Sequence, residues 1–342
     1  MALTITAGGE PLESQQLTAG PVELVAVTSY RVTALSVYVD AAPVSVTWTC
    51  TQDGRLWRTT ATVDLTDVVG PVDMAVQVVT RGTTRQSYPV TVEPAHPWVR
   101  TADTGPRIPR AEMTDHPGGN LSKAGQVIEG LRFTGQVLIR ARDVTLRDCL
   151  FDYPMRSGKM LAAATGGLLL DHCELNGHGD AELGIGGAQF TATHCNIHHL
   201  LDGFRIASGV VIENTWVHHL VRPPRDPKAH GDCVQMTVGT GSTIRRNVFE
   251  AANPDTGDLN NSAVMIGGET GRTQQLTIED NLMGGGNYTV QTGWGDIDHA
   301  TIVLRRNVYT GGWRYGPIKV NRAVSVTGET LTDGTPAKVS RW

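Results

Sequence analysis

The sequence is poor in several features that would assign it to a common class. It has five cysteines in 342 residues, an odd and small number, so a disulfide framework is not expected. Aromatic residues make up 6% and charged residues 18% of the chain, and the formal net charge is −5. This charge argues against a general nucleic-acid-binding protein. No apolar run is long enough to cross a membrane, so membrane insertion is not expected.

The first residues also lack a secretion signal, because Met1 is followed by neither a basic segment nor a long apolar stretch. We therefore expect a chain that stays within a cell or leaves it by another route, such as release within a virion. All five cysteines are expected to be free thiols.

A short pattern recurs through residues 144–312. It reads apolar, any, apolar, any, any, a marker residue, any, apolar, as in Val144-Thr-Leu-Arg-Asp-Cys149-Leu-Phe151. The marker residue is Cys, Thr or Asn, and successive markers are 20 to 34 residues apart. The seven markers are Cys149, Cys173, Cys195, Thr215, Asn247, Asn281 and Asn307. A period of this size indicates stacked repeat units, and the alternation in each copy indicates a strand.

The repeats favour a right-handed parallel β-helix, because about 22 residues per turn accommodate several short strands and no helix. The markers are then an inward ladder at a corner, where small polar groups bond turn backbone. A leucine-rich repeat has a similar period but needs a regular leucine consensus, which is absent. Seven unrelated strands of a sandwich are the remaining alternative.

The chain before the repeats predicts a different all-β unit. Residues 1–93 contain short strand-like runs separated by turn signals, which is typical of an immunoglobulin-like sandwich. We expect an attachment module there. Five prolines in residues 94–120 predict a stiff connector that also caps the first turn. Residues 121–342 are then the β-helix, and Ala323–Trp342 are expected to leave the pattern and cap the last turn. The predicted strands of the first unit are 22–28, 34–38, 44–50, 58–65, 72–80 and 87–92.

Residues 98–321 resemble a pectate-lyase-like β-helix family that occurs in secreted actinobacterial proteins and in minor tail proteins of their phages. The resemblance rests on the run Gly125 to Cys149, on His230-Gly-Asp-Cys-Val-Gln235 and on Asn281-Leu-Met-Gly-Gly-Gly286. It implies the fold and leaves the activity open, because this fold hosts lyases, hydrolases and binders. The missing secretion signal favours the phage member.

Two lines of outward side chains are predicted on successive turns. Two insertions, at 221–229 and 251–259, are expected at one corner of neighbouring turns, where they would wall a groove. The first line is Arg205, Gln235, Met265, Gln291 and Lys319, and the second is Asp152, Asn176, His198, His218 and Glu250.

Three kinds of chemistry are compatible with these residues. Asp202 and Asp232 align on successive turns, with Asp180 nearby, at a separation suited to a retaining glycosidase; alternatively they are turn residues. His198, His218 and Glu250 are weak candidates for metal ligands, and otherwise form a solvated polar line. Aromatic residues beside amide and charged groups suit sugar faces, or else pack under a cap. The expected glycan-binding set is Arg205, His230, Gln235, Gln291, Trp294, Trp313, Tyr315 and Lys319.

We therefore expect a phage tail protein, tailspike-like, that contacts a host cell-surface polysaccharide and is extracellular in the released particle. The alternatives are a polysaccharide depolymerase, hydrolase or lyase, using the same groove, and a purely structural spacer. Other virion tail proteins are the expected partners, a homotrimer is the expected assembly by analogy, and no cofactor is expected.

Overall fold

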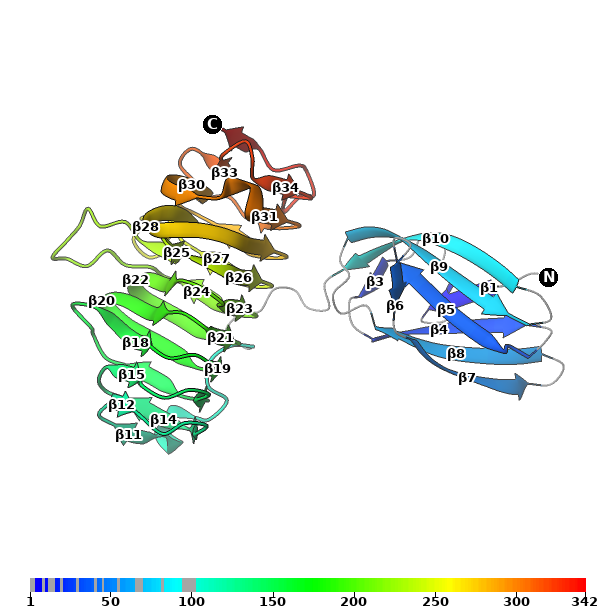
Figure 1. Cartoon of the computed structure of the whole chain (residues 1–342), viewed down its shortest axis with the longest axis horizontal. Coiled ribbons are helices and arrows are strands. Elements are labelled where there is room, and N and C mark those ends of the chain that lie inside the picture. Colours follow the sequence, from blue (N-terminus) through cyan, green and yellow to red (C-terminus); the bar gives the residue numbers. More distant parts are fainter. Residues whose placement is uncertain are drawn as a thin grey trace. The chain divides into compact units, whose positions relative to one another are not determined.

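The computed structural model describes residues 4–7, 10–11, 16–18, 21–28, 31–39, 42–44, 46–53, 56–64, 70–80, 83–93 and 103–342. It divides into two compact units, Met1–Pro97 and Trp98–Trp342 (Figure 1). Both are built from strands, and the described residues contain no α-helix, only two short 3-10 helices, η1 (Arg110–Glu112) and η2 (His299–Thr301). No helix in the described part of the chain has the length and hydrophobicity of a membrane span.

The first unit consists of two five-stranded sheets with orders β2-β1-β4-β8-β7 and β3-β10-β9-β5-β6. Alternate apolar residues of the strands, such as Val37, Val63 and Val76, form a core of their own. All six predicted strand runs overlap strands of the structure. The strands are β1 (Thr4–Ala7), β2 (Glu10–Pro11), β3 (Gln16–Thr18), β4 (Pro21–Thr28), β5 (Ala34–Val39), β6 (Ala42–Val44), β7 (Val46–Asp53), β8 (Leu56–Asp64), β9 (Gly70–Val79) and β10 (Thr83–Glu93).

The second unit is a parallel β-solenoid of 26 strands, and most short strands pair in parallel with the third strand after them. Where one long strand covers two faces, the partner is the second strand after. One rung therefore contains three strands, and the rungs stack into three faces. Face A contains β13 (Val127–Glu129), β16 (Thr145–Arg147), β19 (Leu168–Asp171), β21 (Phe190–Thr193), β23 (Val211–Glu213), β26 (Gly239–Arg245), the second half of β28 (Ser262–Glu279), β31 (Ile302–Arg305) and β34 (Ser325–Thr327).

The other two faces are built in the same way, and the longer strands β20 and β22 turn a corner and belong to both. Face B contains β11 (Thr114–His116), β14 (Leu131–Phe133), β17 (Leu150–Asp152), β20 (Glu174–Gly187), β22 (Asn196–Ile206), β24 (Trp216–His218), β27 (Val248–Glu250), β29 (Leu282–Gly284), β32 (Val308–Tyr309) and β35 (Thr330–Leu331). Face C contains β12 (Gly119–Leu121), β15 (Val137–Ile139), β18 (Lys159–Ala163), β20, β22, β25 (Asp232–Met236), β28, β30 (Tyr288–Ile297), β33 (Gly316–Val320) and β36 (Val339–Arg341).

The corner between faces A and B explains the repeated marker. The residue before each marker has a positive φ, between 49° and 56° in all seven copies, so the chain turns there. Non-glycine residues accept this backbone conformation at a cost, and Asp, Asn and His tolerate it best. Five of the seven copies carry one of these types at that position, namely Asp148, His172, His194, Asn214 and Asp280.

The markers point into the solenoid, as expected, and all seven are fully buried. The Nδ2 atoms of Asn247, Asn281 and Asn307 donate to backbone carbonyls at 2.9, 3.0 and 2.9 Å. These carbonyls belong to strand residues. The Oδ1 atoms of the same asparagines accept from the corner N–H groups of Thr215, Asn247 and Asn281. The prediction that the asparagines bond turn backbone is confirmed by these Oδ1 contacts. The five cysteines are free in the structure, as predicted, and four of them lie in the solenoid core.

Two expectations about the ends of the repeat region are wrong. The parallel sheet already begins at Thr114, inside the segment expected to be a connector, because Thr114–His116 pair with Leu131–Phe133. At the other end, residues 323–342 do not leave the pattern. β34, β35 and β36 pair in parallel with β31, β32 and β33 and complete one more rung.

Candidate functional site

Face C carries the line of outward side chains that the sequence predicts. Parallel pairing aligns Arg205 with Gln235, then Met265, Gln291 and Lys319 on successive rungs. These side chains alternate with core residues and are exposed or half-buried, whereas their strand neighbours are buried. Arg205 donates from Nε to Oε1 of Gln235 at 2.9 Å. The line therefore presents one side chain per rung, and four of its five side chains are polar, with Met265 in the middle.

The two insertions lie between faces B and C on neighbouring rungs, as expected. Residues 221–229 connect β24 to β25, and residues 251–259 connect β27 to β28 (Figure 1). Arg222 of the first insertion forms an ion pair with Asp258 of the second at 2.9 Å. His230, at the end of the first insertion, is exposed. The groove that these loops were expected to wall stays a prediction.

Asp180, expected near the aspartate pair, is engaged elsewhere. It forms an ion pair with Arg156 at 2.8 Å and another with Arg225 of the first insertion. Both guanidinium groups neutralise this carboxylate and fasten the loops across rungs. We therefore assign Asp180 to holding the insertion in place.

Asp202 and Asp232 begin the face C part of successive rungs, but they point inward. Each is in phase with the core residues of its strand, Asp202 with Phe204 and Asp232 with Val234, because side chains alternate along a strand. Asp202 is 2% exposed and Asp232 is fully buried. Asp202 accepts hydrogen bonds from Nη2 of Arg205 at 2.8 Å and from the backbone N–H of Asp232 at 3.0 Å.

The second carboxyl of the pair is less well satisfied. Oδ1 of Asp232 accepts from Nδ2 of Asn261 at 2.8 Å, and Oδ2 is buried with no hydrogen-bond partner among the described residues. Burial raises the pKa of Asp202 to about 6, against the opposing effect of Arg205. Burial and the neighbouring Asp202 charge raise the pKa of Asp232 well above its ordinary value, although Asn261 and Ser262 lower it. Both carboxyl groups therefore keep their protons to a higher pH than exposed aspartates do.

This geometry bears on the predicted catalytic role. A raised pKa suits a general acid, but a glycosidase carboxyl must reach the glycosidic oxygen. Burial of both carboxyl groups separates them from any ligand on the surface. The catalytic assignment of Asp202 and Asp232 stays a prediction, and their burial argues against it.

The expected aromatic residues differ in how they are placed. Trp294 is 80% exposed and Tyr315 is 63% exposed, whereas Trp313 is half-buried and packs against the solenoid core. Tyr315 lies beside Tyr288, with ring centroids 5.6 Å apart, and Nζ of Lys319 lies 5.5 Å from the centre of the Tyr288 ring. Tyr288 was not singled out from the sequence, although it stands three residues before the outward Gln291.

The second predicted outward line, on face B, has the expected register, but its two histidines are not solvated. His198 pairs with Asn176 and His218, yet both histidines are largely buried. Their Nδ1 atoms contact Nδ1 of His199 and His219, and their Nε2 atoms contact Glu174 at 3.1 Å and Asn196 at 2.8 Å. All four ring nitrogens therefore already have partners.

Glu250, the third candidate metal ligand, accepts a hydrogen bond from Nε1 of Trp216 at 3.0 Å. The Trp216 indole stacks on His218 at 3.6 Å between centroids. Burial, together with the neighbouring histidines His198 and His219, lowers the pKa of His218 to about 2, so this ring is neutral. A metal would have to break this network, and the weak metal prediction for His198, His218 and Glu250 gains no support.

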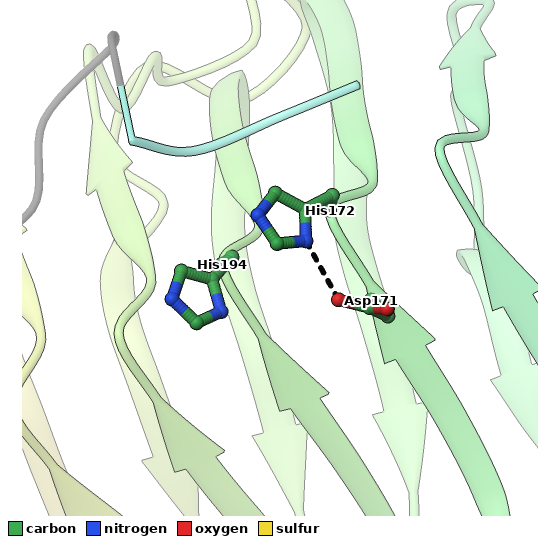
Figure 2. A group of neighbouring side chains, drawn as sticks. All are labelled: Asp171, His172 and His194. Carbon is green, nitrogen blue, oxygen red and sulfur yellow. Dashed lines mark hydrogen bonds and ion pairs between the residues drawn. The ribbon is translucent and has the colours of Figure 1, made fainter. Parts of the chain in front are cut away.

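A different group comes closer to metal-ligand spacing. Ligand atoms of Asp171, His172 and His194 lie within 4.8 Å of one another at the corner of faces A and B (Figure 2). However, the two rings are stacked 4.5 Å apart and within 2° of parallel. A metal at about 2.0–2.1 Å from a ring nitrogen lies in the plane of that ring, so one ion cannot lie in both planes. We assign this group to packing of the corner.

Comparison of the sequence with protein-family models and with curated proteins gave no match. The resemblance to the pectate-lyase-like family therefore stays a prediction, and the site is argued from its own geometry.

Proposed function

We propose that the protein is a tail component of a virion that binds a host cell-surface glycan on face C of its solenoid and does not cleave it. The observation that supports this most is the pair of exposed aromatic side chains, Trp294 and Tyr315, on the late rungs. Exposure of aromatic rings of this size to water is unfavourable in free energy unless a ligand covers them. Their flat faces suit the C–H surfaces of sugars.

Polar groups of the right kind accompany these rings. Gln291 lies on β30 between Tyr288 and Trp294, and Lys319 follows on the next rung. Amide and cationic groups in fixed directions suit hydroxyl-rich ligands. Tyr288 and Trp294 are six residues apart on β30, which is at most about 20 Å. This span favours an oligosaccharide over a single sugar.

The first unit fits the role of an immunoglobulin-like attachment module. Its sheets pair β1 with β4, β4 with β8 and β8 with β7, and place β9 between β10 and β5, an order compatible with that fold. We propose that this unit contacts other tail proteins. A truncated chain that starts near Trp98 should then fail to enter particles, and normal incorporation would contradict the role.

Two further features of the proposal rest on general rules. We propose a right-handed coil, because crossover connections between parallel strands are nearly always right-handed. A homotrimer is proposed by analogy with other tail β-helices. Mass measurement in solution tests the trimer.

Binding of the full chain to host cell-wall polysaccharide tests the proposal. Trp294→Ala and Tyr315→Ala should each weaken binding about tenfold, which corresponds to about 1.4 kcal/mol. Val127→Ala is the matched control, because Val127 is also exposed, at 61%, but lies on an early rung. Equal affinities for all variants would contradict the proposed surface, and no binding by the parent chain would favour a spacer.

A polysaccharide depolymerase is the second candidate, favoured by the raised pKa of Asp202. It predicts soluble oligosaccharide products and their loss in Asp232→Asn. Absence of products from the parent chain would eliminate it.

A further inference from the structure

The buried aspartate pair is part of a hydrogen-bond network that spans four rungs. On one side, Arg205 reaches inward to Asp202 and sideways to Gln235. On the other side, Asn261 donates to Asp232, and Gln291 donates to Oδ1 of Asn261 at 3.3 Å and to Oγ of Ser262 at 2.6 Å. The backbone N–H of Asp232, which donates to Asp202, joins the two halves.

This network connects the surface to the interior. Arg205, Gln235 and Gln291 belong to the outward line of face C, whereas Asp202 and Asp232 are in phase with the core. The Arg205 side chain is 43% exposed, and the Asp202 side chain is 3% exposed. An exposed arginine adopts many orientations unless an anchored partner selects one. Asp202 is such a partner, because its second oxygen is fixed by backbone.

We propose that Asp202 and Asp232 are positioning residues, which hold Arg205 and Gln291 in the orientation that presents them to the glycan, so that glycan affinity follows the ionisation of Asp202. The proposal rests on the glycan-binding function given above. It assigns the pair a role that requires burial, whereas catalysis requires access.

Charge balance in the network gives the direction of the pH dependence. The Asp202 carboxylate and the Arg205 guanidinium compensate each other's charge across the 2.8 Å hydrogen bond between them. Because the pKa of Asp202 is raised to about 6, acidification below pH 6 neutralises this carboxylate and releases Arg205. Glu182 is the other charged group that acts on Asp202, and it favours the protonated form. The groups that act on Asp232 are Asp202, Arg205, Asn261 and Ser262.

The test measures glycan affinity of the full chain between pH 4.5 and pH 8. The parent should bind at least about tenfold more weakly at pH 5 than at pH 7.5, with a midpoint near pH 6. Asp202→Asn should bind with the weak affinity at every pH, because the carboxylate that holds Arg205 is absent. Asp333→Asn, which changes a fully exposed carboxylate of the last rung, is the control and should keep the parent profile.

A measurement without glycan separates this inference from the proposed function. The side-chain carboxyl ¹³C signals of the parent should show one buried aspartate that titrates near pH 6, and the Arg205 Nε signal should shift with the same midpoint. Both changes should vanish in Asp202→Asn. If they are present but the parent binds no glycan, the proposed function fails and the positioning of Arg205 stands.

If no aspartate titrates near pH 6, or the Arg205 signal does not follow it, the inference is wrong whatever the chain binds. A parent that binds glycan with the same affinity at pH 5 and pH 7.5 would also overturn it. The parent profile needs no variant, so misfolding of Asp202→Asn would leave the test intact.

Discussion

The inward ladder has an early half of cysteines and a late half of asparagines. Both halves contact equivalent backbone carbonyls, but through different side-chain groups. In the early rungs, the thiols of Cys149, Cys173 and Cys195 face corner carbonyls at sulfur–oxygen distances of 3.3 to 4.0 Å. In the late rungs, asparagine amides donate to the equivalent carbonyls at 2.9 to 3.0 Å. A thiol is a weak donor and a small hydrophobe, so the early half tolerates imperfect bonding.

The asparagine Oδ1 also accepts hydrogen bonds from N–H groups of the preceding rung, and a thiol is a weak acceptor for such groups. Oδ1 of Asn281 accepts from both the backbone N–H and Nδ2 of Asn247, each at 2.9 Å, and Asn307 serves Asn281 in the same way. Every asparagine therefore depends on the next rung for an acceptor. The asparagine half therefore needs an acceptor beyond its last residue, Asn307.

The largest expected effect comes from breaking the asparagine half in its middle. Asn281→Ala removes the acceptor of two Asn247 donors and the donor to the Ile244 carbonyl, all buried. Leaving such groups unpaired costs about 1–3 kcal/mol each, so we expect a loss of about 3 kcal/mol or more in the free energy of unfolding. Chemical denaturation measures it.

Cys173→Ala is the matched change in the other half. It removes a small buried group and weak contacts, and should cost about 1 kcal/mol. Equal losses for Asn281→Ala and Cys173→Ala would contradict the distinction between the halves.

Glu329 is the terminal acceptor, and it makes the late half sensitive to pH. Its Oε1 accepts from Nδ2 of Asn307 at 3.1 Å, and its Oε2 accepts from the Tyr309 hydroxyl at 2.6 Å. Burial raises its pKa to about 7, although these hydrogen bonds oppose the shift. Because the pKa in the folded state exceeds the ordinary 4.5, its contribution is complete below pH 4.5 and is lost as the pH rises through 7.

Glu329→Gln mimics the protonated side chain at every pH. The two chains should have similar stability at pH 5, and the variant should be more stable at pH 8.5 by up to about 3 kcal/mol. Thermal unfolding across this range measures the difference. A parent that is the more stable of the two at pH 8.5 would show that the carboxylate is the preferred form.

The rate at which each thiol is alkylated also distinguishes the buried ladder from the first unit. Burial raises the pKa of Cys173, Cys195 and Cys233, whereas Cys50 in the first unit is half-buried. In the folded chain, an alkylating reagent should therefore label Cys50 at least about tenfold faster than these three. Denatured but unreduced protein should gain five labels by mass spectrometry, and protection of any pair would indicate a disulfide.

Features of the fold that depend on the local residue pattern could be predicted from the sequence. The rung register and the inward asparagines follow from local alternation and a repeat period, and both are correct. Glu329 was missed because the copy Val324-Ser-Val326-Thr-Gly328-Glu329 carries a residue type that the pattern did not include. The inward direction of Asp202 was available from its phase with Phe204, although Asp202 was considered only as a catalytic carboxylate or a turn residue.

Other features had no signal in the sequence. His198 is buried beside Glu174, and His218 is buried beside Asn196. Each of these contacts joins two rungs, and a single sequence does not reveal it. The same holds for the exposure that separates Trp294 from Trp313. Sequence therefore predicted the scaffold, whereas access to the candidate site required the structure.

The smallest expected effect exchanges one residue type of the ladder for another. Thr215 stands between the two halves and combines their properties, because its Oγ1 donates to the Glu213 carbonyl at 3.0 Å and accepts from the Cys195 backbone N–H at 3.2 Å. Cys195→Thr places the same group one rung earlier. Its hydroxyl would donate to the Thr193 carbonyl, which Sγ of Cys195 now faces at 3.5 Å, and would accept from the backbone of Cys173. The side chains are similar in size, so the stability should change by less than about 1 kcal/mol, in either direction.

Cys195→Val controls for shape without the hydroxyl and should be the less stable of the two variants. A threonine variant no more stable than the valine variant would show that the early corners do not need the stronger hydrogen bond.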